Sequence, residues 1–507
     1  MADTEATTPI VSILILARDA ADCIEATIAS LHPCNGEIIV YDTGSQDGTP
    51  AIAAEAGAKV IRGEWKDDFA AARNAALKHA TAPWILWVDA GETLLRSDAL
   101  ELREFLETTA DPATAYQLFV CIPAEGGQGP GEQIARVRLH PRREEIQFVG
   151  RVRESLLPAL AESELSLDRL ELRLYRGPRE HEPAVKEARA RRNIALAETV
   201  IAEVKPSADM WNCLGEAYQN LSQAAESAAC YRQARQLAEP KSAEELEALY
   251  GLLTSLDTLE TDRQAQLTLS MEALERYPLD SQLLCAMGGY LQALGQEELA
   301  SRSYEVAFRH GMTEPTVWHL PNIMELAASC RVSLLLPRNE SKAFTAAEEG
   351  LKECPDSPRL QRQMLDLLVR RGAKDKALAI VKTMRVQPLL REALETTVHG
   401  ACLAVNQSWI PARAYLQTAL KAGLSDALCY RWLVITHLGL GADHEARAVM
   451  DAWEAFDPRN PEIQAFRQDP RLAGESHHQT PTLRRIDPTP VASNNRPQSR
   501  VSTAKRA

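Results

Sequence analysis

Residues 10–16 read Ile-Val-Ser-Ile-Leu-Ile-Leu, and this run decides the fold of the first part of the chain. Six of its seven residues are apolar, which is typical of a strand buried on both faces of a parallel sheet. Residues 22–31 follow with helical spacing of their apolar side chains, and residues 37–41 read again as a strand. A strand, a helix and a strand in this order predict a βαβ unit.

The alternation of helix and strand continues to about residue 150. Helices are predicted at 51–57 and 69–80, and strands at 59–62, 84–88, 116–122 and 133–139. This order predicts a mostly parallel sheet covered by helices. In such sheets, ligands bind at the carboxyl ends of the strands.

After about residue 180 the strand pattern gives way to a helical repeat. The first unit carries the tetratricopeptide (TPR) pattern at Trp211, Leu214, Gly215, Tyr218, Tyr231 and Ala234. The residue that opens the second helix of each unit recurs at Ser227, Gln266, Ala300, Ala343, Ala377, Ala412 and Ala446. The steps between these positions are 39, 34, 43, 34, 35 and 34 residues, and insertions between hairpins explain the two long ones. We expect about seven hairpins stacked in an all-α solenoid with a concave face.

These patterns divide the 507 residues into four parts. An α/β domain is predicted at 1–175, a linker helix at 176–205, helical repeats at 206–470 and a disordered tail at 471–507. The tail has seven Lys or Arg against two Asp or Glu, while the whole chain has a net charge of −14. The acidic body argues against nucleic acid as a partner.

Cysteine usage and the amino terminus bear on localisation. The ten cysteines include no C-x-x-C pair, so we read them as buried thiols in a reducing compartment and expect a cytoplasmic protein. Residues 1–9 lack the pattern of a secretory signal. The apolar run at 10–17 is too short to cross a membrane, so no transmembrane segment is expected.

Three clusters of polar residues follow predicted strands or open a predicted helix. Asp42 comes directly after the second strand, where its carboxylate can accept hydrogen bonds from a base or ribose. Arg73 lies one turn inside the helix that Asp67 and Asp68 begin. Asp89 and Glu92 follow the fourth strand, and carboxylates there can hold Mg²⁺ or Mn²⁺ against a diphosphate. The alternative for each cluster is a capped polar turn or a structural ion pair.

These blocks together resemble the family 2 glycosyltransferases with the GT-A fold, a Rossmann-like nucleotide-diphospho-sugar transferase domain. The resemblance is to the bacterial subgroup in which TPR repeats follow the catalytic domain. It is carried by residues 12–19, 37–49, 57–60, 64–74 and 84–92, in that order and spacing.

The resemblance implies a donor, a reaction and residue roles. Asp42 corresponds to the carboxylate that binds the uracil of a UDP-sugar, Arg73 to an arginine that holds the nucleotide, and Asp89 to the first Asp of the Asp-x-Asp motif, which holds ribose and metal. It also implies transfer with inversion, in which an acceptor nucleophile deprotonated by a carboxylate displaces the nucleotide from the sugar. The candidate base is Glu154, and the alternative for it is a salt bridge to Arg151 or Arg153.

Three departures from the family pattern fall at the metal site. One is the segment Leu172-Arg173-Leu174-Tyr175, which keeps only the tyrosine of the relatives' His-x-Gly-Tyr. Gly91 stands where the motif has its second Asp, and Glu92 is one residue out of phase in an extended segment. Arg153 stands in Gly-Arg-Val-Arg-Glu, where relatives have a histidine. One hypothesis is that Arg153, with Arg151, supplies the charge of the divalent ion to the leaving diphosphate. The other is an inactive glycosyltransferase-like TPR scaffold for protein–protein interaction.

The repeats add a prediction about partners. TPR grooves bind peptides, so we expect a protein partner in the groove, which is either the acceptor or a recruiting protein. The alternatives are self-association and support of the catalytic domain. The acceptor itself is expected to be a polypeptide or a saccharide. An acidic groove favours a basic segment, such as the tail of this chain.

Overall fold

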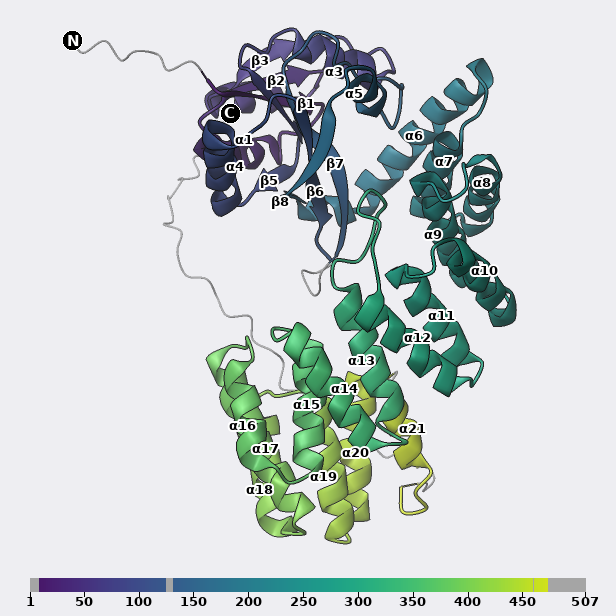
Figure 1. The fold of residues 1–507 in the computed structure, drawn as a ribbon. Helices are drawn as coiled ribbons and strands as arrows, with labels where there is room; N and C mark the ends of the chain where they lie inside the picture. The colour runs from purple at the N-terminus through teal and green to yellow at the C-terminus, as the bar shows by residue number, and fades with distance from the viewer. Residues whose placement is uncertain (1–8, 125–130, 459, 473–507) are drawn as a thin grey trace, which may run out of the picture. The chain divides into compact units, whose positions relative to one another are not determined.

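The computed structural model describes residues 9–124, 131–458 and 460–472. Within these residues an α/β domain is followed by a long run of helices, so the predicted fold class is confirmed (Figure 1). The predicted tail lies outside the described residues from position 473 onward. The chain forms two compact units, which are Met1–Leu368 with Ala379–Arg385 and Val369–Leu378 with Val386–Ala507.

The α/β domain is built on one sheet of eight strands in the order β3-β2-β1-β4-β7-β6-β8-β5. The strands are β1 Val11–Ala17, β2 Glu37–Asp42, β3 Lys59–Arg62, β4 Trp84–Asp89, β5 Glu92–Leu94, β6 Thr114–Ile122, β7 Glu132–Pro141 and β8 Ser166–Arg176. The first four strands in this order run parallel, and β7 joins β4 antiparallel. β1 is buried along nearly its whole length, as its apolar run predicts.

Helices pack on both faces of this sheet (Figure 1). Those on one face are α1 Ile24–Leu31, η1 His32–Cys34, α2 Thr49–Glu55 and α4 Arg96–Thr108, and those on the other are α3 Phe69–Leu77 and α5 Leu157–Glu162. Side chains of β1 alternate between the two cores, with Ile13 and Ile15 in the first and Leu14 in the second. The sheet is therefore covered on both sides, and its strand ends are left to carry the polar residues.

The sheet differs from the prediction in its second half. Two strands are reversed, because β7 runs antiparallel to both β4 and β6, and β5 runs antiparallel to β8. β6 and β8 pair in parallel, so the sheet is mixed, and six of its eight strands run in one direction. β5 and β8 were not predicted as strands. The direction in which two strands pair depends on contacts between distant segments, which local periodicity does not report.

The α-helical region begins after the short 3₁₀ helix η3, Pro178–His181, and consists of α6 followed by seven helix pairs and a final short helix. The helices are α6 Pro183–Glu203, α7 Ala208–Asn220, α8 Ala224–Leu237, α9 Ala243–Thr258, α10 Arg263–Arg276, α11 Ser281–Ala293, α12 Glu297–His310, α13 Ile323–Leu335, α14 Glu340–Glu353, α15 Pro358–Arg370, α16 Lys374–Thr383, α17 Pro388–Val405, α18 Trp409–Lys421, α19 Ala427–Gly439, α20 Asp443–Phe456 and α21 Pro461–Arg467. None of the helices in the described ranges is long and apolar enough to cross a membrane.

The repeat spacing read from the sequence coincides with the helix pairs. The seven recurring residues from Ser227 to Ala446, here called the ruler residues, are each the fourth residue of the second helix of a pair, and all are fully buried. The first pair shows why a small residue is needed where the helices cross. A Cβ atom on Gly215 would lie 2.8 Å from the ring of Tyr231, so only glycine allows the ring to pack there.

Candidate functional site

The candidate site lies at the carboxyl edge of the parallel strands. In the sheet register, Ala17 of β1 pairs with Asp42, and Leu16 pairs with Asp89. Because β1 alone separates β2 from β4, the backbones at these two aspartates are about 10 Å apart. Asp42 and Asp89 therefore end on the same edge, as the strand pattern predicts.

Asp42 is buried and sits in a polar turn. Its carboxylate accepts hydrogen bonds from the backbone N–H of Gly44 at 3.4 Å and of Ser45 at 3.3 Å, and a short one from the Ser45 hydroxyl. Gly44 has a φ of 101°, which a glycine adopts without strain. The carboxylate thus faces neutral donors, and it has capacity for a further donor because an ionised carboxylate offers about four acceptor positions.

Asp89 and Glu92 meet because the chain reverses between β4 and β5. Gly91 has a φ of 98°, and its N–H donates to the Thr27 hydroxyl at 2.9 Å. This turn brings the Glu92 carboxylate back so that it accepts from the Asp89 N–H at 2.9 Å. The expectation that Glu92 points away from Asp89 is therefore wrong, since the segment is a turn and not an extended strand.

Arg73, on α3, joins Asp89 to Glu154. Its Nη2 donates to Asp89 Oδ1 at 2.8 Å, and its Nε donates to Glu154 Oε1 at 2.7 Å. The guanidinium also lies over the rings of Trp87 and Phe148, at 5.1 and 5.4 Å from their centroids. Asp68 begins α3 as its N-cap by accepting from the Ala71 N–H at 2.8 Å, which sets where this helix starts.

Two arginines that the sequence analysis did not single out complete the cluster. Arg138 of β7 donates to Asp89 Oδ2 at 3.1 Å and to Glu92 Oε1 at 2.8 Å. Arg176, at the end of β8, lies 3.3 Å from Glu92 Oε1 and 3.8 Å from Asp89 Oδ2. Both come from the half of the sheet that follows β4 in the strand order, so this half supplies cations to the edge that β2 and β4 line with carboxylates.

The pKa values of Asp89 and Glu92 are shifted in opposite directions. Burial raises the pKa of Asp89, but the guanidinium groups of Arg138 and Arg73 outweigh this effect and hold it well below its usual value. The pKa of Glu92 is raised, because its burial is nearly complete and the charge on Asp89 adds to the effect. Asp89 is therefore the permanent anion of the pair.

The residues at this edge do not fit a divalent metal ion. The guanidinium groups of Arg73, Arg138 and Arg176 balance the carboxyl groups of Asp89, Glu92 and Glu154, so a divalent cation would add two positive charges to a neutral cluster. Within the described ranges, no group of three or more His, Cys, Asp or Glu side chains could hold a metal. The cationic groups at this position are arginines.

Arg151 and Arg153 lie away from the cluster. Arg151 pairs with Glu203 of α6 at 3.1 Å, and Arg153 binds three carboxylates of α7 and α9. Glu154 pairs with Arg73 and not with either of these arginines. Of the predicted site residues, the structure thus brings Arg73, Asp89, Glu92 and Glu154 into contact and places Asp42 on the same edge.

Comparison with known proteins agrees with the predicted resemblance. Residues 12–155 match the sequence model of Glycosyl transferase family 2, and the predicted resemblance is confirmed for this part of the chain. A TPR repeat-containing protein of Synechococcus elongatus is 41% identical over 138 residues, which are 27% of this chain and 33% of that protein. An uncharacterized glycosyltransferase of Rickettsia felis is 32% identical over 121 residues, 24% of this chain and 42% of that protein. The chain thus spans less than half the length of these relatives.

Solved structures similar to the chain include a repeat protein and an enzyme. A tetratricopeptide repeat protein from Parabacteroides merdae is 15% identical, with a TM-score of 0.39, and the match covers 52% of this chain and 97% of that one. Glucosyl-3-phosphoglycerate synthase from Mycobacterium tuberculosis, solved with Mn²⁺, uridine diphosphate and phosphoglyceric acid, is 16% identical, with a TM-score of 0.27. That match covers 36% of this chain and 76% of the synthase.

Proposed function

We propose that the protein transfers a sugar from a nucleotide-sugar donor, a UDP-sugar by preference, to an acceptor nucleophile. The observation that carries this proposal is the edge itself, where carboxylates from β2 and β4 and the arginine of α3 gather at the carboxyl ends of parallel strands. The sequence match of residues 12–155 to a glycosyl transferase family supports the same class of reaction.

The two ends of the edge have different roles in this proposal. Asp42 accepts a hydrogen bond from the N3–H of uracil, because it is a buried carboxylate that faces only neutral donors. Asp89, fixed by Arg73 and Arg138, orients the ribose and the diphosphate. Arg73 keeps one buried N–H, on Nη1, without a partner in the described residues, and an oxygen of the nucleotide is a suitable acceptor for it.

The proposed reaction proceeds without a metal ion. As the bond between the anomeric carbon and the diphosphate oxygen breaks, negative charge develops on the diphosphate, and Arg138 and Arg176 stabilise it in place of a divalent cation. We do not assign this role to Arg151 and Arg153, because their guanidinium groups lie away from the edge, at carboxylates of α6, α7 and α9.

The proposed transfer inverts the configuration at the anomeric carbon. The acceptor nucleophile forms a bond to this carbon while the nucleoside diphosphate leaves from the opposite face, and the proton of the nucleophile passes to a carboxylate. Glu154 is the carboxylate we propose as base, with Arg73 holding its Oε1 at 2.7 Å. The acceptor is a polypeptide or a saccharide in this proposal.

The second candidate is a scaffold that binds proteins and has lost turnover. The observation that favours it is the complete pairing of the three carboxyl groups with three arginines, which is also how a purely structural cluster is built. In this alternative, the repeats bind a partner and the α/β domain is a rigid base for them.

Titration calorimetry with UDP, GDP, CDP and ADP on the full chain separates the two candidates. The transferase requires micromolar to millimolar binding that favours UDP, and slow release of UDP from UDP-sugars through hydrolysis. If none of the four nucleotides binds, the transferase proposal is wrong and the scaffold is the function that stands.

A further inference from the structure

A short loop connects the candidate site to the helical repeats. The backbones of Val149 and Ser155 form a closed pair of hydrogen bonds at 3.0 and 2.9 Å, so the residues between them make a tight excursion. Arg153 has a φ of 54°, a left-handed conformation that a non-glycine residue adopts only when its surroundings hold it there. Within this loop, Arg151 contacts α6 and Glu154 contacts Arg73 of α3.

Arg153 is held by three carboxylates from the first two repeats. Its two terminal nitrogens form a fork on Glu247 of α9 at 2.9 and 2.6 Å. The same nitrogens reach Asp209 at 3.0 Å and Glu216 at 2.8 Å, both on α7. Burial would lower the pKa of Arg153, but these carboxylates outweigh it and raise the pKa well above its usual value.

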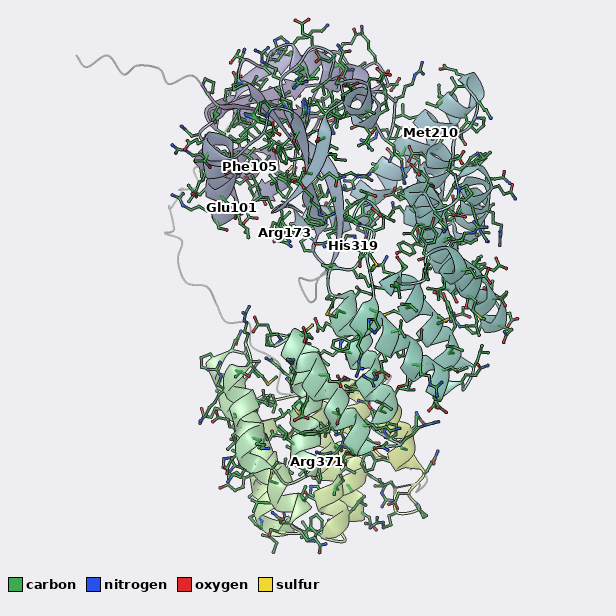
Figure 2. The ribbon with its side chains drawn as sticks, in the orientation of Figure 1. Glu101, Phe105, Arg173, Met210, His319 and Arg371 are labelled. Carbon is green, nitrogen blue, oxygen red and sulfur yellow. The ribbon has the colours of Figure 1, made fainter. Side chains whose placement is uncertain are left out.

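The residues beside Arg153 are bound to the same helices. Arg151 pairs with Glu203 of α6 at 3.1 Å. Val152 is buried in an apolar cluster with Leu196 and Leu214, and Met210 of α7, labelled in Figure 2, packs against this cluster. Three consecutive residues therefore bind the helical region, and the fourth, Glu154, binds Arg73 in the candidate site.

The helices also hold the segment that carries Arg73. Trp65 and Phe69, which precede and begin α3, pack against the same apolar cluster, and the guanidinium of Arg192 lies 4.8 Å from the Phe69 ring centroid. The Phe69 N–H donates to the Arg151 carbonyl at 2.9 Å. Both partners of the Arg73–Glu154 ion pair thus stand on segments that the repeats fix.

We propose that the first two repeats are part of the transferase site and that Arg153 is the positioning residue through which they fix Glu154 against Arg73. This inference rests on the proposed function. It also assigns an occupant to the three carboxylates of α7 and α9. The occupant is an arginine of the α/β domain, bound in the same chain.

The test compares Arg153→Met with Arg153→Lys and with a control, Arg235→Met, in the full chain. Arg235 forms one ion pair between helices of the repeats, with Glu272 at 3.0 Å, and this pair joins α8 to α10 away from the candidate site. At a temperature where circular dichroism shows every variant folded, we expect Arg153→Met to lower kcat at least tenfold. Arg153→Lys recovers part of this loss, because an ammonium group keeps the charge without the fork. Arg235→Met keeps the kcat of the parent within about twofold.

A double variant separates positioning from stability. Arg153→Met with Glu247→Gln removes a carboxylate that the single variant leaves unpaired, so it melts closer to the parent. If Arg153 positions Glu154, kcat stays low in the double variant although the melting temperature recovers. If kcat recovers together with the melting temperature, or if Arg153→Met has the kcat of the parent, the inference is wrong.

Hydrogen exchange keeps this test separate from that of the proposed function. If the parent protein neither binds UDP nor releases it from UDP-sugars, the proposed function fails and exchange decides the positioning claim. We then expect Arg153→Met to speed amide exchange at least tenfold in residues 69–77 and 150–155, with no such change in Arg235→Met. Unchanged exchange in these two segments overturns the inference.

Discussion

Asp42 and Asp89 end two strands that flank β1, yet their surroundings are opposite in character. Asp42 is held by backbone N–H groups and a hydroxyl, all neutral. Asp89 is held by Arg73 and Arg138, and Arg176 lies 3.8 Å away. The same side chain at the same level of the sheet therefore serves as a hydrogen-bond acceptor at one end and as a fixed charge at the other.

This difference suggests that Asp42 recognises a ligand by hydrogen bonding, whereas Asp89 belongs to a fixed arrangement of charges. Hydrogen bonds from neutral donors leave the Asp42 carboxylate able to accept a further donor from a ligand, at a small cost in rearrangement. The ion pairs at Asp89 are preorganised, so they hold their geometry while charge develops nearby. Changes at Asp89 should therefore affect folding and binding together, whereas changes at Asp42 should affect binding alone.

The largest effect is expected for Arg73→Met, which removes one of the ion pairs of Asp89. The variant leaves Asp89 and Glu154 without this cation and removes the guanidinium that packs on Trp87 and Phe148. We expect the free energy of unfolding of the α/β domain to fall by about 3–5 kcal/mol, since breaking a buried ion pair leaves uncompensated charge. Hydrogen exchange of the β1 and β4 amides measures this change in the full chain.

Arg103→Met is the matched control for that substitution. Arg103 pairs with Glu107 on α4 at 2.8 Å, but both side chains are more than 40% exposed. Removal of this pair should change the free energy of unfolding by less than about 1 kcal/mol. Equal losses in the two variants would contradict the distinction between buried and solvated arginines.

The next effect concerns His140, which contacts Trp87 in the strand that ends at Asp89. His140 is fully buried, accepts from Trp87 Nε1 at 3.2 Å and lies with its Nδ1 2.9 Å from the Pro141 carbonyl. Burial lowers its pKa from 6.5 to about 4, so between these values the unfolded chain binds a proton that the folded chain does not. Stability from this residue is therefore present above pH 6.5 and is lost as the pH falls toward 4, by about 3 kcal/mol.

Urea denaturation of the parent and of His140→Gln at pH 7, 6, 5 and 4 measures this contribution. The difference between the two proteins should shrink or reverse toward pH 4, because only the parent has the buried imidazole. His310→Gln, at the exposed end of α12, is the control that removes a histidine elsewhere. A parallel pH dependence in the parent and His140→Gln would show that His140 does not stay neutral in the folded protein.

Much of the fold could be predicted from local sequence signals, and the strands without such a signal could not. The strands at Val11–Ala17 and Trp84–Asp89 and the seven ruler residues of the repeats are visible because their periodicity is set by neighbours along the chain. Leu170, Leu172 and Leu174 alternate with charged residues and are an equivalent signal for β8. β5 has only three residues, which is too short for any period to be read.

The candidate site divides in the same way. The parallel-strand rule suffices to bring Asp42 and Asp89 to one edge, because it needs only the strand order. Arg138 pairs with Glu92, 46 positions earlier in the chain, and the residues around either one do not predict this contact. The one available hint is Arg136, Arg138 and His140, which recur every second residue within a strand and so predict a polar strip on β7.

Arg153 shows a different limit. Its position next to Glu154 suggests that both face the nucleotide, which would place Arg153 at the diphosphate. The left-handed backbone at Arg153 turns its side chain to the helices instead. A backbone conformation of this kind in a non-glycine residue depends on tertiary contacts, so it cannot be predicted from the residue type.

A smaller effect is expected at the other end of the comparison, with Asp42→Asn. The amide keeps an acceptor oxygen for Ser45 but loses the charge, so the hydrogen bond to a nucleobase N–H weakens. We expect UDP affinity measured by calorimetry to fall about 10- to 100-fold, or roughly 1.4–2.8 kcal/mol, while the melting temperature changes little. A large fall in melting temperature would show that Asp42 is structural in the same sense as Asp89.

The smallest expected effect is that of removing divalent ions. EDTA, or added Mn²⁺, should leave UDP affinity and UDP release within about twofold of their values in plain buffer, because the arginines already neutralise Asp89 and Glu92. Arg138→Met sharpens this prediction, since it removes one of the two cations at Asp89 Oδ2 and Glu92 Oε1 and should make binding respond to Mn²⁺. Loss of UDP binding in EDTA by the parent protein would mean that Arg138 and Arg176 leave the carboxylates when the donor binds, and that both ends of the edge change with the ligand.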